Sequence, residues 1–258
     1  MRKPKKKIGI IIFHKNIKEI YEERWIQKCL DSIMTQTNQE FRIFEINYGG
    51  DEYSLIKEYY PKFRRLKFIS EPLDNHAEAM NRIIDEAFSE GCEYVFNVNL
   101  DDYYEKDRIE KQLECLKMGY DVVSSDFSYI YELEGEDKFM TRKLIKQYGP
   151  IRENLLAGHN VIAHPSVAFS KKFWEGNRYD PSEVPMEDLL LWCRSIESGY
   201  KFYIHEDSLL NYRLHENQIT GNNLEKHRNL GHIDDLQGPQ PSNKAHEIQP
   251  LRNIKYDF

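Results

Sequence analysis

Cysteine is scarce in this sequence, and its placement excludes two common uses of the residue. The chain has four cysteines, at positions 29, 92, 115 and 193, with no CxxC pair and no histidines at zinc-ligand spacing. We therefore predict buried free thiols rather than zinc ligands or a disulfide framework. Asn-x-Ser/Thr sites are absent too, which is in keeping with a cytoplasmic protein.

Long apolar runs are lacking as well. The apolar run over residues 8–13 is too short for the core of a secretion signal and far too short to span a membrane. From this we expect a soluble cytoplasmic protein, with a peripheral membrane contact left open. The basic residues among the first seven could touch anionic lipid, nucleic acid or an import receptor, but a flexible, solvated head over residues 1–7 is the better expectation.

The charge balance and the missing motifs exclude several functional classes. A net charge of -7 argues against a general nucleic-acid binder, which needs a basic face. The sequence has no GxxxxGK[ST] loop, no HExxH and no GxSxG, so P-loop, zincin and hydrolase chemistry lack their ligands or nucleophile. Gly49-Gly50 also lacks the three-glycine spacing of a dinucleotide-binding loop.

The sequence does contain an alternation of strand and helix patterns, which predicts an α/β fold with a mostly parallel, doubly wound sheet. Helical patterns cover residues 20–34, 75–88, 106–118 and 187–198, and Asn75 with Glu78 is typical of a capping box. Strands are predicted over residues 8–13, 41–46, 66–69, 94–101, 122–124, 167–169, 201–204 and 209–214, with a hairpin over 129–140. From residue 221 onward the chain is polar, and we expect an extended or partly disordered tail.

The stretch from Tyr94 to Asp102 is the most informative in the chain. An apolar run of β-branched and aromatic residues ends there at two adjacent carboxylates, Asp101 and Asp102. Ligands of open α/β sheets bind beyond the carboxyl ends of the strands, and carboxylates at that place suit Mg²⁺ or Mn²⁺ together with substrate phosphates. The alternative, in which these aspartates only cap a helix, stays open at this point.

The order of several short motifs resembles the family 2 inverting glycosyltransferases of the GT-A fold. The resemblance runs from about Ile8 to about Gln218 and lies in the first strand, residues 32–37 with Phe41, 79–82, 99–102, 187–188 and 212–215. It implies a GT-A (Rossmann-like) fold with a mixed, mostly parallel central sheet and flanking helices. It also implies one domain over residues 8–220, with a nucleotide-sugar-binding half (8–126) and an acceptor-binding half (127–220), before the polar tail (221–258).

This resemblance implies metal-dependent transfer of a sugar, with inversion, from a nucleotide-sugar donor to an acceptor hydroxyl. Residues 99–102 match the family's DxD variant, which implies that Asp101 binds Mn²⁺ or Mg²⁺ with Asp102 beside it. Asn99 would then lie near the donor ribose, and His215 is the implied third metal ligand. A cation is needed because breaking the sugar–phosphate bond leaves extra negative charge on the nucleoside diphosphate.

Glu187-Asp188 resembles the acidic pair that supplies the family's catalytic base. Such a base accepts the proton of the acceptor hydroxyl as its oxygen attacks the anomeric carbon. We predict Asp188 as this base, with Glu187 as the alternative. Two acids in a first helical turn also complement the helix dipole, and that purely structural role is the competing explanation.

Further positions are implied around the donor and the acceptor. The acceptor pocket is expected at His164, and the donor site is expected to contain Phe13, His14, Asn47, Tyr48, Arg82, Asn99, Asp101 and Arg213. Asn47 and Tyr48 depart from the family's usual Asp-Asp-Gly-Ser, so we expect Tyr48 to stack on the base and Asn47 to hydrogen-bond its edge. A UDP-sugar is the first expectation for the donor, with GDP- and dTDP-sugars left open.

Two other functions remain open from the sequence. A nucleotidyltransferase on a related fold would use the same carboxylates but release pyrophosphate. A non-catalytic nucleotide-sugar-binding or partner-binding domain would account for the altered residues Asn47, Tyr48 and Asn99. No motif specifies the acceptor, which could be a glycan, a lipid-linked sugar, a protein side chain or another hydroxyl compound.

Overall fold

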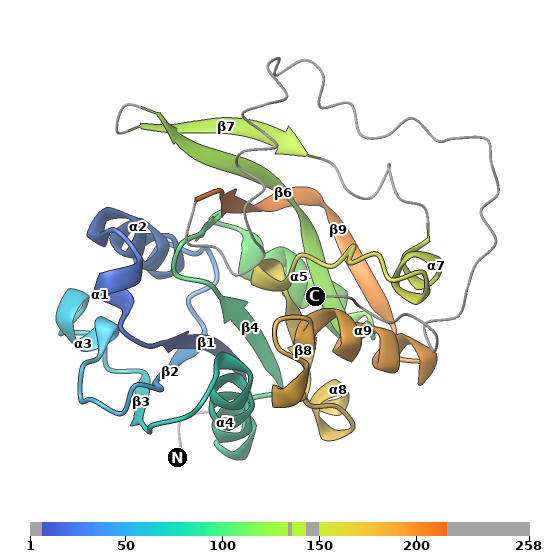
Figure 1. Cartoon of the computed structure of the whole chain (residues 1–258), viewed down its shortest axis with the longest axis horizontal. Helices are drawn as coiled ribbons and strands as arrows, with labels where there is room; N and C mark the ends of the chain where they lie inside the picture. The colour runs from blue at the N-terminus through green and yellow to red at the C-terminus, as the bar shows by residue number, and fades with distance from the viewer. Residues whose placement is uncertain (1–6, 134–135, 143–149, 216–258) are drawn as a thin grey trace.

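The structure is a computed structural model, and it describes residues 7–133, 136–142 and 150–215. The predicted polar tail (221–258) and the predicted basic head, apart from Lys7, lie outside these residues. Within them, nine strands form a single mixed sheet with helices packed on both faces (Figure 1). The predicted α/β class is confirmed.

Four parallel strands form the N-terminal half of the sheet, in the order β3-β2-β1-β4. They are β1 (Ile8–His14), β2 (Phe41–Asn47), β3 (Leu66–Ser70) and β4 (Tyr94–Val98). Nearly all side chains of β1 and β4 are buried because both faces of the sheet are covered, which explains their continuous apolar runs. The carboxyl ends of these strands meet at one edge of the sheet.

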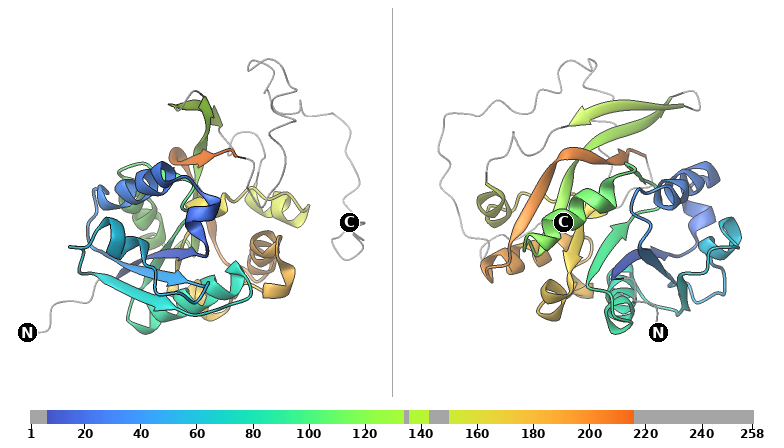
Figure 2. Two further views of the ribbon diagram at one scale, coloured as in Figure 1. Left: turned by 60° about the vertical axis from the view of Figure 1, so that its left-hand side comes forward. Right: turned by 180° about the vertical axis from the view of Figure 1, so that it is seen from behind.

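Helices cover the two faces and define two cores, and Figure 2 shows them on both sides of the sheet. On one face, α2 (Glu23–Met34), α3 (Leu55–Tyr59) and α5 (Arg108–Lys117) share a core with Ile10 and Ile12 of β1. On the other face, α4 (His76–Ser89) and α9 (Glu187–Glu197) share a core with Ile11. The shorter helices are α1 (Ile17–Ile20), α7 (Ile151–Leu156), α8 (Lys171–Glu175), η1 (His164–Ser166) and η2 (Pro181–Glu183).

The cap predicted for α4 is confirmed. The side-chain oxygen of Asn75 accepts a hydrogen bond of 3.1 Å from the backbone amide of Glu78. The Glu78 carboxylate bonds the amide of Asp74, one residue before the position that a full capping box uses. This cap fixes the start of α4 and with it the position of His76, the first residue of the helix.

The C-terminal half of the sheet adds antiparallel strands. β8 (Ala168–Ser170) runs antiparallel between β4 and β6 (Val122–Leu133), and β6 pairs in parallel with β9 (Phe202–Arg213). β5 (Tyr103–Tyr104) pairs antiparallel with β9, and β7 (Glu136–Arg142) pairs antiparallel with β6. The predicted mixed sheet is thus confirmed, as is the hairpin. Residues 134–135, between its two strands, lie outside the described residues.

Two boundaries differ from the prediction. The segments 201–204 and 209–214 belong to one strand, β9, because exposed Glu206 and Asp207 lie in a bulge opposite β6 instead of ending the ladder. The strand predicted to reach Asp101 ends at Val98, and a turn follows in which the Asp102 amide donates to the Asn99 carbonyl at 3.3 Å. Asp101 and Asp102 therefore lie in a turn beyond the strand.

Candidate active site

The turn after β4 carries two buried carboxylates. Asp101 is 7% exposed and Asp102 is 1% exposed. One Asp101 oxygen, Oδ2, lies 3.1 Å from Nε2 of His215, while Oδ1 has no hydrogen-bond partner among the described residues. Oδ1 of Asp102 accepts the backbone amide of Arg213 at 2.8 Å, and its Oδ2 is likewise without a partner there. Buried unpaired carboxylate oxygens are costly, so this turn is suited to a cation.

The electrostatics of the turn agree with that fit. Burial, and after it the negative charge of Asp101, raise the pKa of Asp102 well above its usual range. However, no group of three His, Cys, Asp or Glu side chains within residues 7–133, 136–142 and 150–215 is arranged to hold a metal. The predicted trio of Asp101, Asp102 and His215 is therefore not assembled as a three-ligand cage. Instead, Nε2 of His215 contacts Oδ2 of Asp101, and Oδ1 of Asp102 accepts the Arg213 amide. Asp101 fits a cation that takes its other ligands from substrate phosphates and water.

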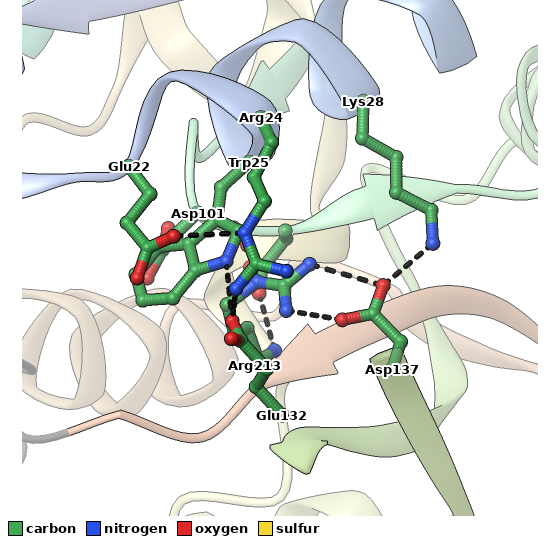
Figure 3. A network of polar contacts seen from close by, with 9 residues as sticks. Glu22, Arg24, Trp25, Lys28, Asp101, Glu132, Asp137 and Arg213 are labelled. Carbon is green, nitrogen blue, oxygen red and sulfur yellow. Dashed lines mark hydrogen bonds and ion pairs between the residues drawn. The ribbon is translucent and has the colours of Figure 1, made fainter. Parts of the chain in front are cut away.

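Arg213, predicted to bind the donor, is buried and holds this turn through hydrogen bonds (Figure 3). Its side chain is 1% exposed. Its Nε donates to the carbonyl of Asp101 at 2.9 Å, while Nη1 and Nη2 donate to the two carboxylate oxygens of Asp137 at 2.6 and 3.3 Å. The guanidinium also lies over the Trp25 ring, 4.8 Å from its centroid. These contacts favour a positioning role over the predicted phosphate contact.

Two aromatic residues that the sequence analysis missed flank His215. The ring centroids of Tyr21 and Trp25 lie 5.5 and 5.2 Å from that of His215. Burial, and after it the charges of Asp101 and Asp102, raise the pKa of Tyr21. Trp25 follows the helical pattern of α2, so its sequence position indicates only a core residue. No local signal identifies these residues, because they meet His215 only in the folded structure, from positions nearly 200 residues earlier in the sequence.

The loop after β2, expected to read the nucleotide base, is held by its own residues. The amide of Asn47 donates to Oδ1 of Asp51 at 2.7 Å and to the carbonyl of Tyr53 at 3.1 Å, and its oxygen accepts the amide of Gly49 at 3.0 Å. Asn47 is fully buried, so these bonds give it a loop-holding role, and its contact with a base edge remains a prediction. Tyr48 is half-buried, and its ring lies under the ammonium group of Lys15 at 5.7 Å.

His14 and Phe13, at the end of β1, are also turned into the protein. Nε2 of the buried His14 lies 3.0 Å from Oε1 of Glu45, a fully buried carboxylate on β2. The same carboxylate accepts the hydroxyl of Ser54 and the backbone amides that open α3. Phe13 is half-buried against the core that includes α4. Both residues therefore contact other parts of the protein at the end of β1. Their direct contacts with the donor remain predictions.

Arg82 and Asn99 are each held by other residues of the protein. Arg82, on α4, forms ion pairs with Glu71 at 3.1 Å and with Glu86 at 3.0 Å. The side-chain oxygen of Asn99 accepts from the amide of Asn97 at 3.2 Å. The backbone amide of Asn99 is bound to the Tyr104 hydroxyl at 2.8 Å, which fixes the start of the acidic turn. Their donor contacts remain predictions.

A second pair of carboxylates lies at the start of α9. Glu187 is 6% exposed, its Oε1 is 2.7 Å from Nε2 of His76, and its Oε2 has no hydrogen-bond partner in the described part of the chain. Burial acts to raise the pKa of Glu187, but the hydrogen bond and charge of His76 outweigh it and hold that pKa below its usual value. Asp188 is half-buried, with Oδ2 accepting the amide of Asn160 at 2.9 Å and Oδ1 accepting the backbone amide of Leu189 at 2.6 Å.

His164 links the second carboxylate pair to β4. Its Nε2 is 3.0 Å from the Tyr179 hydroxyl, and its pKa is lowered by burial in spite of the opposing charges of Asp188 and Glu187. The amide of Asn97, on β4, donates to the carbonyl of His164 at 3.2 Å as well as to Asn99. Some of the predicted residues thus lie in two clusters, one around Asp101 and one around Glu187, and Asn97 of β4 contacts a residue beside each. The others, Phe13, His14, Asn47, Tyr48 and Arg82, lie in neither cluster.

Comparison with known proteins places the chain in a family. The model of the Glycosyl transferase family 2 matches residues 10–176. The chain belongs to this family and is a glycosyltransferase. The predicted family is confirmed.

Curated relatives have the same activity class in their names. The chain is 26% identical over 200 residues to the uncharacterized glycosyltransferase MJ1057 of Methanocaldococcus jannaschii, covering 74% of this chain and 67% of that protein. It is 24% identical over 208 residues to the O-antigen biosynthesis glycosyltransferase WbnJ of Escherichia coli, covering 75% and 76% of the two chains. It is 23% identical over 219 residues to the dTDP-rhamnosyl transferase RfbG of Shigella flexneri, covering 81% and 76%.

Solved structures confirm the GT-A fold. The structure of S. aureus TarS 1–349 in complex with UDP-GlcNAc has a TM-score of 0.63 and 16% identity, over 84% of this chain and 61% of that one. The complex of the same fragment with UDP has a TM-score of 0.60. The chain spans about three fifths of the length of these structures. Within the described part of the chain, no helix has the length and apolar character needed to cross a membrane.

Proposed function

We propose that this glycosyltransferase transfers a sugar from a nucleoside diphosphate sugar to an acceptor hydroxyl, with a divalent cation at the donor and with inversion at the anomeric carbon. The observation that carries the proposal is the pair of buried acidic clusters joined by β4, each of which contains a carboxylate oxygen without a partner in the described residues. One cluster suits the metal and diphosphate, and the other suits proton transfer.

The nucleotide is proposed from the ligands and names of similar proteins. TarS has been solved with UDP and with UDP-GlcNAc, which supports a UDP-sugar as the first donor to test. The name of RfbG, a dTDP-rhamnosyl transferase, supports dTDP-sugars as the second. Both bases present the pyrimidine edge that the loop after β2 would meet.

The donor cluster would work through Asp101. Its free Oδ1 would ligate Mn²⁺ or Mg²⁺, and His215 would orient the carboxylate through Oδ2. When bound, the cation supplies positive charge against the charge that develops on the leaving diphosphate. Asp102, held by the amide of Arg213, would lie beside the cation without being a necessary ligand.

The acceptor cluster would work through Asp188, with Glu187 beside it. In a single displacement, the acceptor oxygen forms a bond to the anomeric carbon while the bond from that carbon to the diphosphate oxygen breaks. The bonding electrons leave with the nucleoside diphosphate, and the hydroxyl proton passes to the base. Asp188 suits this role because its carboxylate is only half-buried and an acceptor can reach it, whereas Glu187 is buried and bound to His76.

The donor assignment is tested by thermal shift. Wild type, Asp101→Asn and the control Asp85→Asn, which removes a carboxylate on α4, are each mixed with UDP-, dTDP-, GDP- and CMP-sugars with and without Mn²⁺. A ligand at a hundredfold excess over its dissociation constant should stabilise the fold by about 2.7 kcal/mol. We expect a Mn²⁺-dependent shift from one nucleotide class in wild type and in Asp85→Asn, and its loss in Asp101→Asn. Equal shifts in all three proteins would contradict the assignment of Asp101.

A further inference from the structure

The β6–β7 hairpin is bound to helix α2 by two carboxylates, as Figure 3 shows. Glu132, on β6, accepts a hydrogen bond from Nε1 of Trp25 at 3.3 Å and forms an ion pair with Arg24. Asp137, on β7, forms an ion pair of 2.5 Å with Lys28. Both carboxylates therefore dock the hairpin on α2, and Asp137 is the one that also pairs directly with Arg213 of the candidate active site.

Asp137 reaches the acidic turn through Arg213. The Asp137 side chain is 12% exposed and the Arg213 side chain 1%, so their paired contact is shielded from water. The guanidinium uses its two Nη atoms on Asp137, and this leaves Nε for the carbonyl of Asp101 at 2.9 Å. The backbone of the same arginine holds Asp102, because its amide donates to Oδ1 at 2.8 Å.

The charge of Asp137 explains why Oδ1 of Asp101 remains open. A buried guanidinium requires an anionic partner. Because the guanidinium is planar, two hydrogen bonds to one carboxylate fix its orientation. With Asp137 in place, Arg213 points Nε at the main chain of the turn and not at its carboxylates. Without Asp137, the nearby carboxylates of Asp101 and Asp102 become the anions available to Arg213, and a cation would have to compete with it.

We propose that Asp137 is a positioning residue of the acidic turn: it holds Arg213 on the main chain of Asp101 and so keeps the Asp101 carboxylate open for a divalent cation. This rests on the proposed function as far as the cation is concerned. The placement of Arg213 by Asp137 is a statement about the metal-free protein and can be tested separately. Residues supporting a metal ligand commonly change metal affinity or activity by about 10- to 100-fold when replaced.

The experiment compares three variants that separate the contacts of the hairpin. Asp137→Asn keeps the shape of the side chain but removes the charge that Arg213 requires. Lys28→Met removes the other partner of Asp137 and leaves the two hydrogen bonds between Asp137 and Arg213 intact. Glu132→Gln weakens the docking of the hairpin on Arg24 and Trp25 without touching Arg213. Thermal unfolding of each variant first establishes that it is folded at the assay temperature.

Hydrogen exchange of the metal-free proteins gives the first readout. The Arg213 amide should exchange at least about tenfold faster in Asp137→Asn than in wild type, since its bond to Asp102 loosens, and should be unchanged in Lys28→Met and Glu132→Gln. Unchanged exchange in Asp137→Asn, or equal acceleration in all three variants, would overturn the positioning claim. This arm gives an answer even if wild type binds no nucleotide sugar, in which case only the proposed function fails.

The metal dependence of turnover gives the second readout. In Asp137→Asn the Mn²⁺ concentration for half-maximal turnover should rise about 10- to 100-fold, with much of the rate recovered at saturating Mn²⁺, while the two control variants follow wild type. A merely destabilised fold would not produce such a selective change. If Asp137→Asn does not fold, the double variant Asp137→Asn/Arg213→Met removes both buried charges. Because the competing guanidinium is then gone, its Mn²⁺ concentration for half-maximal turnover should stay within a few-fold of wild type, and a rise of about 10- to 100-fold would overturn the proposal.

Discussion

Nε2 of His76 lies 2.7 Å from Oε1 of Glu187, and each residue is the first of its helix, α4 and α9 respectively. The contact joins positions 111 residues apart. It leaves the second oxygen of Glu187 buried and without a partner in the described part of the chain. Glu187 therefore enters the candidate active site in one fixed orientation, next to the residue proposed as the base.

Replacing His76 should lower the rate more than it weakens donor binding. We expect His76→Gln, which retains a hydrogen-bond donor, to lose less than His76→Ala, with kcat in the alanine variant falling by up to about 10²-fold as the carboxylate loses its orientation. Steady-state kinetics with a saturating donor would measure this. Equal kcat values in the two variants and wild type would show that the contact does not position the site.

The acid stability of the protein should depend on Glu187. Its pKa is held below the ordinary value of 4.5, so the unfolded chain binds this proton more tightly than the folded protein. Ionised Glu187 therefore adds stability above pH 4.5, and this contribution is lost as the pH falls through the lowered pKa. The difference in free energy of unfolding between wild type and Glu187→Gln, from urea titrations, should shrink between pH 6 and pH 3. Glu175→Gln on α8 serves as the control for removing one surface carboxyl, and a pH-independent difference would contradict this account.

Kinetics of variants should distinguish the roles of Glu187 and Asp188. Loss of a general base costs about 10²- to 10⁴-fold in rate, so Asp188→Asn should lose transfer on that scale while retaining the donor-induced thermal shift. Glu187→Gln should lose less if Asp188 is the base. A larger loss in Glu187→Gln than in Asp188→Asn would reverse the two roles.

The stability of the strand that connects the clusters should depend on Arg108. Its buried guanidinium donates to the carbonyl of Asn97 at 2.8 Å and to Oε1 of Gln112 at 2.9 Å, and it lies over the Tyr104 ring. Arg108→Met keeps the apolar stem but leaves these acceptors without their donor, and we expect a loss of about 1–3 kcal/mol in the free energy of unfolding. Lys111→Met, on the same helix but partly exposed, should cost less than about 1 kcal/mol. Similar losses in the two variants would contradict the role of Arg108.

Much of the fold could be predicted because its strands are buried on both faces and therefore appear as continuous apolar runs, such as residues 8–13. The position of Asp101 beyond β4 followed from the same pattern, although the strand ends three residues earlier than its apolar character indicates. Residues 201–214 were divided wrongly because exposed Glu206 and Asp207 resemble a strand break, whereas pairing with β6 carries the strand through them.

The partners of the site residues could not be predicted, since they depend on contacts between distant segments. Arg213 was expected at a phosphate, but the hairpin brings Asp137 to it, 76 residues away in the sequence. Tyr21, just before α2, and Trp25, on α2, meet His215, which follows β9, only in the folded chain. His76 likewise has no local signal beyond its place in a helix cap.

The most direct test of the account is the product that wild type forms from the nucleotide sugar that stabilises it. With Mn²⁺ and no added acceptor, slow transfer to water should release the nucleoside diphosphate together with a sugar of inverted anomeric configuration, observed by NMR before mutarotation. Asp101→Asn and Asp188→Asn should release neither. Release of pyrophosphate would instead indicate a nucleotidyltransferase, and a sugar with retained configuration would contradict the proposed single displacement.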